Sequence, residues 1–144
     1  MTSWRDDTPE DAQADLDGLL EEAMGFAIAQ LEKRGAFLPF GSRVAADGER
    51  KAFMVDPEST DAELHLRGLA SILVKQRGEL RAAVRVSDRH VPELEGDAIH
   101  FAADHSCGTS LVVMAPYSLS GEGPHVVELG TLRAERGEAE IWGA

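Results

Sequence analysis

The spacing between hydrophobic residues changes along this chain, and the change separates predicted helices from predicted strands. Intervals of three and four residues are typical of amphipathic helices, and they predict helices at about 12–33 and 60–77. Beyond Gly78 an interval of two takes over, and alanine and valine alternate with arginine. This pattern indicates a half-buried strand that keeps its arginines on the open face.

Most of the remaining chain has the pattern of short strands. Asp47-Gly48 lies between two strand-like runs and predicts a hairpin. The expected strands are 37–46, 50–55, 80–87, 97–106, 109–117 and 125–133, followed by a short final piece that ends at Trp142. Short connections favour antiparallel pairing. We therefore expect an α+β fold of order α-β-β-α-β-β-β-β, with two helices packed on one face of an antiparallel sheet.

A chain of 144 residues corresponds to one domain at ~100–200 residues per domain. We expect a flexible acidic tail at 1–10 and a single α+β domain at 11–144. The residues expected in its core are Leu20, Met24, Ile28, Leu69, Ile72, Leu73, Val84, Val86, Ile99, Phe101, Leu111 and Val113.

The chain is strongly acidic, and its charge is unevenly distributed. It carries 14 Lys and Arg against 26 Asp and Glu, a formal net charge of −12, and residues 1–32 hold nine acids and one base. Residues 67–89 are instead basic. Because the net charge repels nucleic acid and anionic membranes at long range, we expect neither as a partner. A basic protein is the favoured partner.

Two further observations bear on the compartment. The N-terminal segment is acidic and polar, unlike a signal peptide, and the sequence lacks the run of about 20 apolar residues that a spanning helix needs. The single cysteine, Cys107, excludes an intramolecular disulfide. These features predict a cytoplasmic protein.

Candidate catalytic and metal-binding groups are few. His105 and Cys107 share one face of a predicted strand, an arrangement that suits an activated thiol but supplies too few ligands for zinc. Asp104, His105 and Ser106 are the residue types of a catalytic triad, but strand neighbours point to opposite faces. Motifs for dinucleotides, phosphate loops and calcium are missing from the sequence. We expect no catalytic centre, no metal and no cofactor.

The polar face of the sheet is the predicted binding surface. Its arginines have one parity on the strand after Gly78, and a ladder of arginines beside His and Asp suits a carboxylate or a phosphate. Two aromatic residues near strand ends are expected to anchor a partner at the rim. The expected binding residues are Arg81, Arg85, Arg89, His100, Asp104, Tyr117 and Trp142. Arg85→Ala should then leave folding intact and weaken a complex.

Several short motifs, taken in order, resemble a family of small bacterial α/β proteins with no assigned activity. They are Ala36-Phe37-Leu38-Pro39-Phe40, Asp47-Gly48-Glu49, Asp97-Ala98-Ile99-His100, Ala115-Pro116-Tyr117 and Gly137-Glu138-Ala139-Glu140-Ile141-Trp142. The resemblance covers roughly 36 to 142, and it assigns no residue a function. The element order also resembles that of roadblock-type scaffold modules, and a shared order of elements does not imply a shared function.

These observations favour a non-catalytic binding protein of the immunity type, which would neutralise a basic partner. The alternative is a scaffold or regulatory module that self-associates, for instance as a homodimer. A third hypothesis is a small hydrolase or thiol enzyme that uses His105 and Cys107.

Overall fold

The computed structural model describes residues 4–54, 61–94, 96–121 and 124–142. Within them it has two α-helices and a seven-stranded antiparallel sheet, which confirms the α+β class. The elements are η1 (Trp4–Asp7), α1 (Glu10–Arg34), β1 (Phe40–Ala45), β2 (Arg50–Phe53), α2 (Ala62–Gln76), η2 (Arg77–Glu79), β3 (Leu80–Val91), η3 (Pro92–Leu94), β4 (Gly96–His105), β5 (Ser110–Ser120), β6 (Val126–Leu129) and β7 (Arg133–Arg136).

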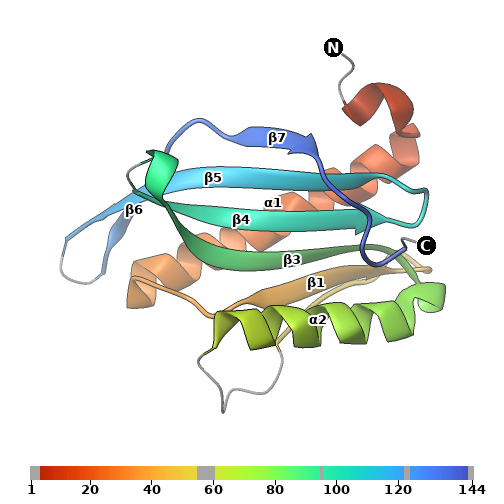
Figure 1. Cartoon of the computed structure of the whole chain (residues 1–144), viewed down its shortest axis with the longest axis horizontal. Helices are drawn as coiled ribbons and strands as arrows, with labels where there is room; N and C mark the ends of the chain where they lie inside the picture. Colours follow the sequence, from red (N-terminus) through yellow and green to blue (C-terminus); the bar gives the residue numbers. More distant parts are fainter. Residues whose placement is uncertain (1–3, 55–60, 95, 122–123, 143–144) are drawn as a thin grey trace.

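The sheet has the order β2-β1-β3-β4-β5-β6, and β7 also pairs with β5 (Figure 1). The strand expected at 125–133 is β6 alone, and a further short strand, β7, begins at the last residue of that range. The two strands pair with different ends of β5. The chain leaves the sheet between them, where the Gly130 amide donates to the Pro116 carbonyl at 2.7 Å. The final piece that ends at Trp142 is not a strand.

The two helices lie on opposite sides of the sheet, α1 behind it and α2 in front of it in Figure 1. Val84 and Val86 of β3 share a core with α1, and we call their side of the sheet the α1 face. Ala83, one residue away and of opposite parity, shares a second core with Leu73 of α2, and we call that side the α2 face. This placement differs from the expectation that both helices cover one face. Gly41 of β1 lies on the α2 face, and its lack of a side chain lets α2 approach this strand closely.

Gly41 shows how close that approach is. A Cβ added at this residue would lie 3.0 Å from the Phe53 ring and 3.4 Å from Leu69 of α2. The next α2-face residue of β1, Arg43, hydrogen-bonds to Gln76 at the end of α2. Asp61 is the N-cap of α2, and its side chain accepts hydrogen bonds from two backbone amides of the first turn. Thr60, the expected start of this helix, lies outside the described residues.

The buried stripe of α1 is shifted by about one residue from the expected one. Leu20, Met24 and Ile28 are half-buried, as is Ile72 of α2, whereas the other residues expected in the core are buried. The residues that α1 buries are Ala12, Leu16, Leu19, Ala23, Ala27 and Leu31. Small residues in this stripe bring the helix close to the sheet, which leaves the larger side chains at its edge.

A β-bulge interrupts the start of β3. Between Val44 and the next residue, β1 advances by one position while β3 advances by two, from Ala82 to Leu80. Arg81 is the extra residue, and a bulge changes the direction of its side chain. Arg81 therefore reaches Asp15 of α1, whereas Leu80 packs in the core of the α2 face.

The N-terminal segment, expected to be a flexible tail, contacts the rest of the fold from Trp4 onward. The Arg5 guanidinium contacts Asp17 of α1 at 2.7 Å, and the buried Thr8 hydroxyl lies 2.8 Å from that of Thr109. The Trp4 side chain packs against the core that α1 forms with the sheet. These contacts order a segment whose composition alone indicated a tail.

Candidate functional site

The register of the α2 face places side chains from four strands in one row. Ser87 of β3 pairs with His100 of β4, His100 with Met114 of β5, and Met114 with Arg133 of β7. Directly paired residues of antiparallel strands have Cβ atoms about 4.5–5.5 Å apart, so each side chain of the row is the direct neighbour of the next. Of these four residues, the sequence predicted only His100 as part of a binding site.

Arg85, expected on an open surface, is buried. Its side chain is 9% exposed, and its guanidinium contacts Glu140 at 2.7 Å and Asp104 at 3.6 Å. The C-terminal segment that carries Glu140 crosses in front of the sheet here (Figure 1). The expectation that Arg85 is available to a partner without loss of folding is therefore corrected, because the residue holds this segment to the sheet.

Asp104 is the buried acid of the same network. Its carboxylate accepts a hydrogen bond from the Ser110 hydroxyl at 2.6 Å, and the oxygen of that hydroxyl also lies 3.1 Å from the Glu138 carbonyl. Burial raises the pKa of Asp104, and the hydrogen bond from Ser110 and the charge of Arg85 oppose this effect. Asp104 is thus a structural partner of Arg85 and is closed to solvent.

His100 has a different environment. Neither of its ring nitrogens has a hydrogen-bond partner among the described residues, and the residue is half-buried. Burial, with a smaller contribution from the nearby charges of Arg89 and Arg85, lowers the pKa of His100 to about 4. His100 is neutral at pH 7, so its ring has one N–H donor and one free acceptor.

A hollow of about 290 Å³ lies beside this row, between η3 and β7. Its apolar floor consists of Val91, Val112 and Met114, and Arg133 and Glu135 stand at one wall. Arg89, exposed at the far end of β3, donates from its Nε to the Ser87 hydroxyl at 3.2 Å. The hollow thus combines an apolar surface with nearby cationic groups.

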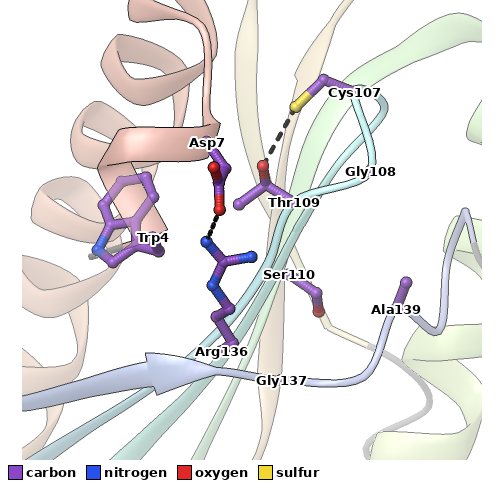
Figure 2. Close-up of a pocket in the computed structure, with 9 residues that line it drawn as sticks. All are labelled: Trp4, Asp7, Cys107, Gly108, Thr109, Ser110, Arg136, Gly137 and Ala139. Carbon is purple, nitrogen blue, oxygen red and sulfur yellow. Dashed lines mark hydrogen bonds and ion pairs between the residues drawn. The ribbon is translucent and has the colours of Figure 1, made fainter. Parts of the chain in front are cut away.

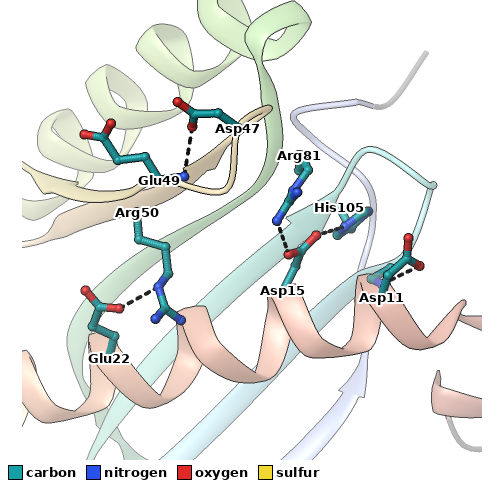
Figure 3. Close-up of polar contacts among 9 residues, drawn as sticks. Asp11, Asp15, Glu22, Asp47, Glu49, Arg50, Arg81 and His105 are labelled. Carbon is teal, nitrogen blue, oxygen red and sulfur yellow. Dashed lines mark hydrogen bonds and ion pairs between the residues drawn. The ribbon is translucent and has the colours of Figure 1, made fainter.

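Arg81 belongs to another cluster, on the α1 face, which Figure 3 shows. The Asp15 carboxylate accepts from the Arg81 guanidinium at 2.7 Å and lies 3.0 Å from Nε2 of His105. The other ring nitrogen of His105 accepts from the Cys107 amide at 3.0 Å. Because both nitrogens of His105 are engaged, the neutral ring carries its proton on Nε2 and has no free atom for proton transfer.

Cys107 lies at the rim of a second hollow, of about 270 Å³, between η1 and the turn that follows β4 (Figure 2). Its thiol contacts the Thr109 hydroxyl at 3.4 Å, and an ion pair between Asp7 and Arg136 crosses the opening. The thiol has no hydrogen bond to His105. Cys107 and His105 therefore do not form the thiol–imidazole pair that a thiol enzyme would need.

The two expected aromatic anchors lie on different faces. Tyr117 is buried on the α1 face, where its hydroxyl donates to Asp88. Burial and the contact with Asp88 both raise the pKa of Tyr117. Burial also raises the pKa of Asp88, and the hydrogen bond from Tyr117 opposes this effect. Trp142 packs in the core of the α2 face and donates to the Arg77 carbonyl at 3.3 Å. Neither residue stands at the rim of the surface where it was expected.

A third hollow, of about 270 Å³, runs along the edge of α1. Leu20 and Met24 of α1 face Phe101 of β4, and Leu132 closes the far side with 52% of its surface exposed. The acidic residues of the rim are Asp17 and Glu21, and Val113 of β5 completes the lining. An apolar hollow with acids at its edge is suited to a basic, amphipathic partner.

Among the described residues, no cluster of three or more His, Cys, Asp or Glu side chains is arranged to hold a metal ion. None of the helices in the described part of the chain is both long and apolar enough to cross a membrane.

No protein-family model, curated protein or solved structure matches this chain. The resemblance to a bacterial α/β family therefore stays a prediction, and the site is built from this chain alone. Sequence reasoning did not identify Met114, Arg133 or Glu140 as site residues, because their positions depend on strand register and on the path of the C-terminal segment. The position of Asp15 does have a signal in the sequence. It stands three residues after Ala12 and four before Leu19, both buried, so helical spacing places it on the buried side of α1.

Proposed function

We propose that this protein is a non-catalytic, cytoplasmic binding protein that recognises a basic protein partner, as an immunity-type protein does when it neutralises a toxin. The single observation that carries the proposal is the apolar hollow along α1 with acids at its rim. A partner with apolar side chains flanked by Lys or Arg would bury the exposed surface of Leu132 and contact Glu21.

The charge distribution supports the same partner class. Residues 1–32 hold nine acids and one base. Asp15 and Glu22 have cationic partners within the chain, and so does Asp17. Glu21 is exposed and has no such partner among the described residues. Of the two acids that line the hollow, Glu21 is therefore the one available to an incoming cation, and electrostatic attraction at this position would raise the rate of association.

The test is a titration with a short amphipathic helical peptide of leucine and lysine, compared with a peptide of the same composition in scrambled order. We expect the amphipathic peptide to bind and to weaken as salt is added. Glu21→Gln and Leu132→Ala should each weaken binding, while the matched control Glu79→Gln, an exposed acid in η2, should not. Equal binding of the scrambled peptide, or unchanged binding by both variants, would refute the proposal.

Self-association through a sheet edge is the alternative. The edge strands β2 and β7 present exposed charged residues, namely Arg50, Lys51, Arg133, Glu135 and Arg136, whereas the edge strand β6 exposes Val126 and Leu129 beside Glu128. Charged side chains on edge strands disfavour pairing between sheets. Size-exclusion chromatography at several protein concentrations separates the two hypotheses, since only self-association predicts an elution volume that changes with concentration.

A further inference from the structure

The uncovered part of the α2 face carries a pocket of its own, away from the acidic edge of α1. Figure 1 shows that α2 runs along β1 and that the C-terminal segment crosses β5, β4 and β3 near the turn that joins β4 to β5. The hollow floored by Val91, Val112 and Met114 lies on the remaining part of this face. Its apolar floor calls for a ligand with an apolar body.

Among the described residues, one side chain with unpaired hydrogen-bond donors lines this hollow, and two more stand on the neighbouring strands of the same face. Arg133 is exposed and has no carboxylate within ion-pair distance among the described residues. His100, beside Met114 in the cross-strand row, has ring nitrogens that no described residue bonds. Arg89 uses only its Nε, so its two terminal nitrogens are unpaired within the described part of the chain. All three side chains are able to donate hydrogen bonds to an oxyanion.

We propose that this hollow binds a small monocarboxylate with an apolar body. The apolar body rests on Val112 and Met114, and the carboxylate accepts hydrogen bonds from Arg133 and from the neutral ring of His100. Arg89 contributes its positive charge from the neighbouring strand. This site is independent of the proposed basic partner, because it lies on the opposite face of the sheet.

The local charges favour a monoanion over a phosphate dianion. Arg133 and Arg89 supply two positive charges, and the acids Glu93 and Glu135 stand at the walls of the hollow. Arg85 adds little, because Asp104 and Glu140 already pair with it. The two wall carboxylates balance the two arginines, so a second negative charge on the ligand would add repulsion from Glu93 and Glu135 without gaining a further cation.

The proposal is tested by NMR titration with hexanoate, hexanol and inorganic phosphate, followed at the methyl groups of Val112 and Met114. We expect hexanoate to produce saturable shifts. Hexanol and phosphate should bind about tenfold or more weakly, since hexanol lacks the carboxylate and phosphate lacks the apolar chain. Equal binding of phosphate would indicate a general anion site, and equal binding of hexanol a purely apolar one. Either result, or the absence of saturation by hexanoate, overturns the proposal.

Two variants test which side chains bind the carboxylate of the ligand. Arg133→Gln removes an exposed side chain from an edge strand, and it should weaken hexanoate about tenfold while leaving hexanol unchanged. His100→Gln should weaken hexanoate in the same direction. Arg67→Gln is the matched control, because it removes an exposed guanidinium from α2, and it should have no effect. Unchanged affinity in both test variants, or an equal loss in the control, contradicts the assignment.

Discussion

Protonation of His100 should destabilise the folded protein in acid. Burial is the larger cause that lowers the pKa of His100 from 6.5 to about 4, and the positive charges of Arg89 and Arg85 act in the same direction. The unfolded chain therefore binds more protons at this residue between about pH 6.5 and pH 4. Because stability rises with pH wherever the unfolded state binds more protons, His100 makes the protein lose stability as pH falls through this window.

The size of the effect follows from the difference between the two pKa values. At ~1.36 kcal/mol per pKa unit, the change from 6.5 to about 4 corresponds to roughly 3 kcal/mol. The ring is only half-buried, so solvent screens part of this energy, and we expect about 1–2 kcal/mol. Asp104 and Asp88 act in the opposite direction, because their raised pKa values favour the folded state below those pKa values and this contribution is lost as pH rises through them.

A comparison with His100→Gln separates the histidine from these acids. Urea unfolding at pH 7 and at pH 4 should show that the wild-type protein loses about 1–2 kcal/mol more than the variant on acidification. His90→Gln, which removes an exposed histidine, is the matched control and should follow the wild-type profile. Identical pH profiles for wild type and His100→Gln would refute the reasoning, as would an NMR titration of the His100 ring with a midpoint near 6.5.

The remaining predictions concern packing. Arg85→Ala should destabilise the protein by about 3–5 kcal/mol in urea unfolding, because it leaves the buried Asp104 carboxylate without its cation. Gly41→Ala should cost about 1–3 kcal/mol, since the added methyl meets the Phe53 ring at 3.0 Å. Gly25→Ala should stabilise by about 0.5–1 kcal/mol, because it lies inside α1 and a Cβ there meets no atom within 4 Å.

Each packing prediction has a control within the chain. Arg89→Ala removes an exposed arginine from the same strand as Arg85, and it should change the unfolding free energy by no more than about 0.5 kcal/mol. An equal effect of both arginine substitutions would contradict the buried ion-pair network. A neutral Gly41→Ala would show that α2 does not approach β1 closely, and a destabilising Gly25→Ala would show a packed environment on that side of α1.

The elements of this protein were largely determined by local pattern. Helix α1, the hairpin at Asp47-Gly48 and the alternation in β3 follow from interactions between residues a few positions apart, so periodicity and turn chemistry were sufficient to predict them. The same parity correctly separated Val84 and Val86 from Ala83 and Arg85. It did not indicate which element covers each side.

The candidate site depended on the tertiary structure. The bulge at Arg81 moved that arginine toward α1, and the C-terminal segment brought Glu140 onto Arg85, which closed a surface that strand parity had left open. The row from Ser87 to Arg133 exists only because β7 pairs with β5 in one register. The alternation of residues along a strand assigns them to two faces of the sheet. Which segment covers each face depends on packing between segments far apart in the chain. Local sequence therefore predicted the strands of this sheet, and only long-range packing decided which of their polar residues are buried and which remain open to a ligand.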